Sequence, residues 1–107
     1  MELAYRQLSG DEIEAGLREL KGWVVEGDRL AKSFQFDTYL AGADFVAKVA
    51  HTADAMDHHP DVSREPDSLV FRLWTHSEDG VTTKDVDLAA RVDQVLSGSA
   101  TDTGTTA

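Results

Sequence analysis

The amino-acid sequence predicts an α+β domain in which helices pack on one face of an antiparallel-rich sheet. Short apolar runs with the strand period of two alternate with segments that repeat apolar residues at helical spacing. The strand-like segments come in adjacent pairs with a helix between the pairs, an arrangement typical of α+β folds. The predicted order is helix, hairpin, helix, one or two strands, and a final helix.

The first helix is predicted to begin at Asp11, after a cap at Ser9 or Gly10, and to end before Gly22. Residues 23–25 and 30–36 form a hairpin in this interpretation, because the turn-rich Glu-Gly-Asp segment between them has hairpin length. In the second strand the alternation of side chains places the large apolar residues on one face together with one lysine. These residues are Leu30, Lys32, Phe34 and Phe36.

The longest helix is predicted over residues 39–56, with Asp37 or Thr38 as its cap. Pro60 cannot continue a helix and disfavours helical backbone in the residue before it, so the helix must end abruptly. Apolar residues recur at alternating intervals of four and three residues, which indicates an inner helix face with larger apolar residues beside it. That face is Tyr39, Ala43, Val46, Ala50 and Ala53, flanked by Phe45, Val49 and Met56.

Residues 61–68 fit either a short edge strand interrupted by Pro66 or a loop. Residues 69–76 are apolar on both faces, which is typical of an interior strand. Thr82 is a plausible cap for the last helix, with Asp85 at the capping-box spacing. That helix is expected to bury Leu88, Ala89, Val92, Val95 and Leu96.

The chain of 107 residues has room for one domain and one modest core. We expect this domain to cover residues 1–97 and a disordered tail to cover 98–107, because the tail has no large apolar residue. The formal charge of -10 opposes direct binding to nucleic acids or anionic membranes. The absence of cysteine, of a signal-like start and of a long apolar run favours a cytoplasmic location.

Three of the four histidines fall in two short motifs, Asp57-His58-His59-Pro60-Asp61 and Thr75-His76. Histidine both donates and accepts protons near neutral pH. If the fold brings these imidazoles together, general acid–base chemistry on a small molecule is the natural use for them. Asp54 lies one helical turn before His58 and is predicted to face it if the helix persists that far.

Taken in order, four features resemble the pterin-4a-carbinolamine dehydratase family over roughly residues 10–97. They are Gly22-Trp23, the helix end Asp-Ala-Met-Asp-His-His-Pro at 54–60, Thr75-His76, and Gly-Val-Thr-Thr-Lys-Asp at 80–85. The resemblance implies a four-stranded antiparallel sheet with three helices, in the order αββαββα. It also implies a 4a-hydroxytetrahydrobiopterin dehydratase, which converts 4a-hydroxytetrahydropterin to quinonoid dihydropterin and water in pterin recycling.

By this resemblance His58 and His76 are the expected acid–base pair, and His59 holds the substrate and shares in the chemistry. Asp85 is expected to support catalysis. The expected substrate contacts are Asp54, Asp57, Trp23 and Thr75. The resemblance implies no metal and no organic cofactor, a pterin as the small-molecule partner, and a homodimer or homotetramer.

The sequence departs from the family's pattern in the strand after His-His-Pro, where Val62 and Pro66 replace aromatic residues, and in the turn after His76, where Asp79 replaces a glycine. These changes affect one wall of the expected pocket and leave the histidines in place.

Three other interpretations stay open. The same fold could serve as a noncatalytic dimerisation, assembly or binding module. The three histidines and an aspartate could supply the nitrogen and oxygen ligands of a metal site. Asp85 could be only a helix cap, and His51 is expected to be structural or exposed to solvent.

Overall fold

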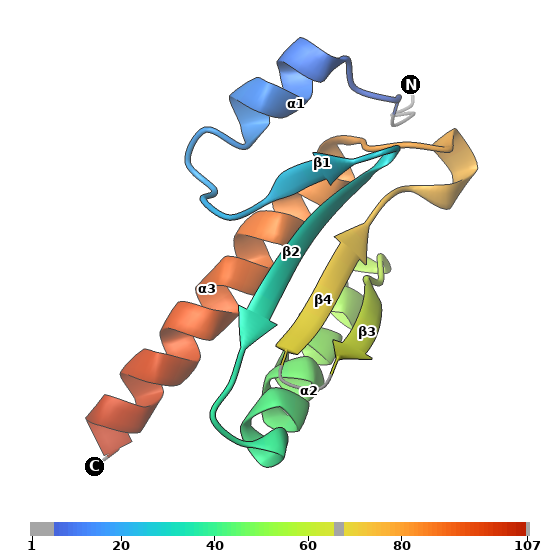
Figure 1. Ribbon diagram of the computed structural model, residues 1–107. Helices are drawn as coiled ribbons and strands as arrows, with labels where there is room; N and C mark the ends of the chain where they lie inside the picture. The colour runs from blue at the N-terminus through green and yellow to red at the C-terminus, as the bar shows by residue number, and fades with distance from the viewer. Residues whose placement is uncertain (1–5, 66–67, 107) are drawn as a thin grey trace.

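The structure is a computed structural model that describes residues 6–65 and 68–106, with side chains described as far as residue 97. Its elements follow the order αββαββα, which confirms the predicted fold class (Figure 1). They are α1 (Gly10–Gly16), β1 (Val24–Glu26), β2 (Arg29–Gln35), α2 (Tyr39–Met56), β3 (Asp61–Glu65), β4 (Ser68–Leu73), a short 3-10 helix η1 (His76–Glu78) and α3 (Thr83–Thr106).

The sheet is antiparallel throughout, with the strand order β1-β2-β4-β3. Strands β1 and β2 are joined by a two-residue turn in which Gly27 has a φ of 64°, a left-handed conformation that glycine adopts at little cost. Residues 61–65 form an edge strand, so the strand interpretation is right for this part of the segment. Pro66 lies outside the described residues.

The core lies between the sheet and the helices α2 and α3, which cover the same face of the sheet (Figure 1). The large apolar residues of β2 point to that face, as the sequence predicts. In β4, which is predicted to be apolar on both faces, Leu69, Phe71 and Leu73 are buried and Val70 on the other face is half-buried. The largest buried side chains there are Leu30, Phe34, Phe71 and Leu73, with Phe45 and Val49 from α2 and Leu88 and Val92 from α3. Helix α1 lies beside β1 and adds Ile13 to the same core.

The inner face of α2 differs from the predicted one. The buried residues are Gly42, Phe45, Val49 and Ala53, whereas Tyr39 at the start of the predicted stripe is 72 % exposed. The ring of Phe45 packs 5.2 Å from Phe34 and 5.6 Å from Phe71, measured between ring centroids. The larger ring therefore sets the rotation of the helix. Ala43 and Ala50 of the predicted stripe turn toward solvent, while its Val46 packs against the core and its Ala53 is buried.

Two helix ends also differ from the predicted ones. Helix α1 ends at Gly16, capped by Leu17, instead of continuing toward Gly22. Helix α3 continues to Thr106, so no break in the helix marks the predicted domain limit at residue 97. The disordered tail over 98–107 stays a prediction, and so does the cytoplasmic location. Within residues 6–65 and 68–106, every helix is too short or too polar to cross a membrane.

Candidate functional site

The site begins at the C-terminal end of α2, where the backbone turns sharply. Asp57 is in the left-handed region with a φ of 53° and ψ of 43°. The amide of His58 donates to the carbonyl of Ala53 at 3.0 Å, and that of Asp57 donates to Asp54 at 3.1 Å. These two bonds form a Schellman ending. Beyond it the next two side chains take different environments, since His58 is buried and His59 is exposed.

The His58 imidazole pairs with a buried carboxylate. Its Nε2 lies 2.6 Å from Oδ1 of Asp85, whose exposed fraction is 0 %. The other oxygen of Asp85 accepts hydrogen bonds from the Thr75 hydroxyl at 2.8 Å and from the Thr82 amide at 2.9 Å. An ionised carboxylate can only accept, so His58 Nε2 carries the hydrogen in this pair. Nδ1 is then the ring nitrogen that remains for proton exchange with a ligand.

The two threonine hydroxyls complete the polar cluster around Asp85. They lie 2.8 Å apart. Since the Thr75 hydroxyl donates its hydrogen to Asp85, the Thr82 hydroxyl must donate to Thr75. Thr82 Oγ1 in turn accepts from the Lys84 amide at 3.2 Å, in the first turn of α3. Asp85 thus caps α3 and holds His58 at the same time, so the capping and site interpretations of this residue do not exclude each other.

His59 pairs with a different carboxylate, near the surface. Its Nε2 lies 2.8 Å from Oδ1 of Asp54, and the two side chains are 58 % and 76 % exposed. The sequence predicts that Asp54 faces His58 if the helix persists that far, but the helix ends at Met56 and Asp54 pairs with His59. The left-handed residue Asp57 ends the helical spacing, so the chain turns His58 inward and brings His59 beside Asp54.

His76 lies directly after Thr75 and begins η1. Its ring packs against the indole of Trp74, with 4.5 Å between ring centroids and a 37° angle between the planes. Among the side chains that the structure describes, no carboxylate pairs with His76. The Thr75 hydroxyl links it indirectly to His58, because Asp85 binds both Thr75 and His58.

The turn after His76 is held by the chain segment before α1. The Gln7 side chain donates to the carbonyl oxygens of Glu78 and Asp79 at 2.8 and 3.2 Å. The Leu8 amide donates to the carbonyl of Val81 at 2.8 Å. A Cβ atom on Gly80 would lie 2.6 Å from the Gln7 side chain, so this close approach requires glycine. Sequence reasoning missed Gln7, because nothing in its local pattern marks a contact 71 residues away.

Trp23 lies apart from the residues described above. It is 5 % exposed, packs edge-on against Phe34, and donates from its indole nitrogen to Asp93 of α3 at 3.1 Å. Lys32 also reaches Asp93, at 3.0 Å. The described contacts of Trp23 are therefore with the core and the middle of α3, and none of them is with a histidine. The charged Lys32 on the apolar face of its strand was the sequence signal for this half-buried pair with Asp93.

The metal interpretation requires ligands that converge on one point. Here the neighbouring histidines go to two different carboxylates, His58 to Asp85 and His59 to Asp54. In the part of the chain that the structure describes, no group of three His, Asp or Glu side chains is placed to hold a metal ion.

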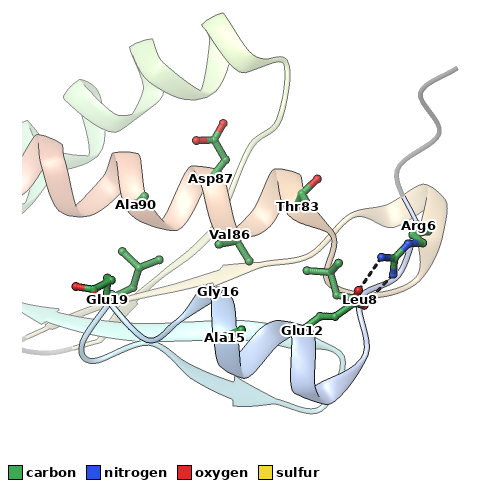
Figure 2. Close-up of a pocket in the computed structure, with 11 residues that line it drawn as sticks. Arg6, Leu8, Glu12, Ala15, Gly16, Glu19, Thr83, Val86, Asp87 and Ala90 are labelled. Carbon is green, nitrogen blue, oxygen red and sulfur yellow. Dashed lines mark hydrogen bonds and ion pairs between the residues drawn. The ribbon is translucent and has the colours of Figure 1, made fainter. Parts of the chain in front are cut away.

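A hollow of about 670 Å³ lies between α1 and α3, and none of the residues that line it is a histidine (Figure 2). Its wall is mostly apolar, and Arg6 forms an ion pair with Glu12 at one end. A second hollow of about 520 Å³ lies beside β1 and is lined in part by Trp23, Val24 and Val25. Neither hollow contains a predicted acid–base residue.

Comparison with known proteins gives consistent matches. The sequence pattern of the family described as pterin 4 alpha carbinolamine dehydratase matches residues 6–95. A relative from Mycobacteroides abscessus is 44% identical over 86 residues, covering 80% of this chain and 92% of its own length. One from Sulfolobus acidocaldarius is 40% identical over 89 residues, covering 83% and 98%. Both are named as candidate pterin-4-alpha-carbinolamine dehydratases.

A solved structure is similar as well. The crystal structure of a transcriptional coactivator/pterin dehydratase from Brucella melitensis superimposes with a TM-score of 0.79 at 33% sequence identity. The match covers 84% of this chain and 98% of that one. The similarity therefore extends over nearly the whole of the Brucella chain.

Proposed function

Because this chain belongs to the pterin 4 alpha carbinolamine dehydratase family, we propose that it removes water from 4a-hydroxytetrahydropterin through proton transfer by His58, His59 and His76. The family makes it a hydro-lyase. We propose both the pterin reaction that the chain carries out and the side chains that move the protons.

The reaction needs an acid and a base on one ring system. The bond between the 4a carbon and its hydroxyl oxygen breaks, and the oxygen takes a proton and leaves as water. The neighbouring ring nitrogen gives up its hydrogen as a proton, and the electrons of that bond form the new carbon–nitrogen double bond. Atoms and charge balance without an oxidant, so positioned proton donors and acceptors are sufficient. In this mechanism the chain needs neither a metal nor an organic cofactor.

The observation that carries the proposal is the buried pair of His58 and Asp85. The carboxylate fixes the orientation of the imidazole and assigns the hydrogen to Nε2, which leaves Nδ1 for the substrate. The same carboxylate holds Thr75, the residue before His76. We assign the acid–base pair to His58 and His76 on this basis. The exposed His59, held by Asp54, is assigned to binding the pterin and sharing in proton transfer.

The proposed substrate contacts are Asp54, Asp57, Thr75 and Trp23. Asp54 and Asp57 are exposed and flank the histidines in the chain. The hydroxyl of Thr75 donates to Asp85 and its backbone amide donates to the carbonyl of Gly80, so a contact with the pterin must share these groups. A contact between Trp23 and the pterin is the hardest of these to form, because the indole nitrogen of Trp23 is already hydrogen-bonded to Asp93.

The test is the dehydration rate of enzymatically generated 4a-hydroxytetrahydropterin, measured with chelator present. We expect wild type to be far faster than the uncatalysed reaction and His58→Ala and His76→Ala each to lose about 10²- to 10⁴-fold in rate. A well-folded wild type that is no faster than background would refute the dehydratase proposal. Loss of activity on adding chelator would refute the metal-free mechanism.

A second candidate is a noncatalytic binding or assembly module. The similar Brucella protein is named as a transcriptional coactivator together with a dehydratase, which favours keeping this candidate in view. A pure assembly module would neither bind a pterin nor stabilise on adding one. Calorimetric titration with a reduced pterin therefore separates the two candidates. The net charge of -10 argues that any such role works through protein partners and without direct contact to nucleic acid.

We also propose that the chain forms a homodimer or homotetramer. Strands β1 and β3 are the edges of the sheet, and an uncovered edge can pair with a second copy. Light scattering on the purified protein would measure the number of subunits, and a monomer at micromolar concentration would refute the proposal.

A further inference from the structure

His76 differs from the other two histidines of the motifs in what holds its side chain. His58 and His59 each have a carboxylate partner within 2.8 Å. The described ring contact of His76 is with the indole of Trp74, at 4.5 Å between centroids. His76 is exposed, whereas Trp74 is half-buried. An exposed imidazole without a hydrogen-bonded partner samples several rotamers unless a neighbouring side chain restricts it.

The backbone on both sides of His76 is fixed, so the orientation of its ring depends on the side chain alone. The Thr75 amide donates to the carbonyl of Gly80 at 2.8 Å, and the Thr75 hydroxyl binds the buried Asp85. The Asp79 amide closes η1 by donating to the carbonyl of His76 at 3.2 Å. What remains free is rotation about the His76 side-chain bonds, and the indole face of Trp74 limits it.

Trp74 is itself held in place by a cation. The guanidinium carbon of Arg29 lies 3.9 Å from the centroid of the Trp74 ring, within the range of a cation–π interaction. Leu30 and Leu73 are partners in the sheet and point into the core. Arg29 and Trp74 are the next residues outward on the two strands, so they lie opposite each other on the face away from the helices.

We propose that Trp74, held by Arg29, is a positioning residue that fixes the His76 imidazole for proton transfer. This inference rests on the proposed function, because it assumes that His76 takes part in the reaction. Proton transfer requires the donor and acceptor atoms to stay within hydrogen-bond reach, and a displacement of about 1 Å can lower a rate about 10²-fold. Carboxylates orient His58 and His59, and an aromatic stack does the same for His76.

The kinetic test compares Trp74→Leu, Trp74→Phe and Arg29→Gln. Trp74→Leu should lower kcat about tenfold or more while KM changes less than about threefold, because the substrate still binds but the ring is no longer fixed. Trp74→Phe keeps an aromatic face and should recover most of kcat, and Arg29→Gln should fall between the two. Arg72→Gln is the matched control: it removes a cation from the same sheet face that pairs with Glu26, and its kcat should equal that of wild type.

NMR spectroscopy tests directly whether the His76 ring stacks on the indole of Trp74. In wild type the indole ring current should move the His76 ring protons upfield, and His76→Ala identifies those signals. They should move downfield in Trp74→Leu and stay in place in Arg72→Gln. Thermal melts check that each variant is folded. If Trp74→Leu does not fold, Arg29→Gln decides the question, because it should still lower kcat whereas Arg72→Gln should not.

The outcomes separate this inference from the proposed function. If His76→Ala abolishes activity while folded Trp74→Leu, or Arg29→Gln where Trp74→Leu does not fold, keeps the wild-type kcat, the positioning role is refuted and the dehydratase proposal stands. If His76→Ala itself keeps full activity, the assignment of His76 to proton transfer fails, and the positioning role fails with it.

Discussion

Oδ1 of Asp85 lies 2.6 Å from Nε2 of His58, inside the protein and 27 residues away along the chain. This contact joins the end of α2 to the first turn of α3. The other oxygen of Asp85 caps α3 and binds Thr75. One carboxylate therefore connects His58, at the end of α2, with the start of α3 and with the residue before His76. Stability and activity should therefore change together when it is altered.

Asp85→Asn should lower both quantities. The amide group cannot accept from His58, Thr75 and the Thr82 amide as the carboxylate does, so at least one buried donor is left without a partner. We expect a loss of about 2–4 kcal/mol in the free energy of unfolding, measured with urea. We also expect kcat to fall about 10- to 100-fold, since His58 loses the partner that orients it.

Asp93→Asn is the matched control for that variant. Asp93 is also on α3 and also accepts buried or half-buried hydrogen bonds, from Trp23 and Lys32. This variant should lose stability and keep kcat within about twofold of wild type, because Asp93 and Asp85 share no partner in the described part of the chain. If Trp23 contacts the pterin, the loss of its bond to Asp93 should appear in KM. Equal losses of kcat in the two variants would mean that Asp85 acts through stability alone.

At Asp57 the role of the carboxylate can be tested separately from the role of the left-handed backbone. Asp57→Gly keeps the left-handed φ without strain, whereas Asp57→Ala should lose about 1 kcal/mol of stability. If the carboxylate binds the pterin, both variants should raise KM about tenfold or more, as expected for a lost hydrogen bond to a charged group. A wild-type KM in Asp57→Gly would show that this residue only ends the helix. Thermal melts and initial rates measure the two effects.

The start of α1 should contribute stability that depends on pH. Hydrogen bonds from Arg6 and from the Ser9 amide hold the pKa of Glu12 at about 2, below its ordinary value of 4.5. A folded-state pKa that is depressed stabilises the protein above the unfolded value, and this contribution disappears as the pH falls from about 4.5 toward 2. Wild type should melt above Glu12→Gln at pH 7, and the two melting temperatures should converge near pH 2. A constant difference over this range would contradict the assignment.

The tail prediction can be tested by truncation. Removing residues 98–107 should change the melting temperature by less than about 2 °C, because the segment has no large apolar side chain to bury. Removing residues 95–107 should lower it by several times that amount, since Val95 and Leu96 pack against the core. A large effect of the shorter truncation would place residues 98–107 inside the folded domain.

Local periodicity was sufficient to predict the three helices, the hairpin and the interior strand. The edge strand at 61–65 stayed open between strand and loop, and the full order αββαββα came from the family resemblance. Leu30 and Phe34 alternate with polar residues along β2, and their burial follows directly from the period of two. The inner face of α2 could not be read in the same way, because two stripes fit the helical spacing. Phe45 decides which stripe is buried, because its ring packs against the rings of Phe34 and Phe71. That packing depends on residues distant in sequence.

The motifs of the proposed site could be read from the sequence, but the pairs that their side chains form could not. The two histidine motifs could be read from the sequence, and the Thr82 and Asp85 spacing indicated a cap. Which carboxylate each histidine contacts depends on the left-handed turn at Asp57, which rotates the chain away from the helical register. Contacts such as Trp23 with Asp93 join segments 70 residues apart and leave no trace in local spacing.

The bonds from Gln7 to Glu78 and Asp79 also bear on how the protein is produced. They tie the beginning of the chain to the turn that starts at His76, so any fusion joined just ahead of Gln7 enters the fold beside that turn. A tag fused directly to Gln7 would add bulk and charge next to a proposed acid–base residue. A tag after residue 107 enters through α3, whose far end in Figure 1 lies on the opposite side of the molecule. Kinetic work on this protein is best done with the tag at the C-terminal end.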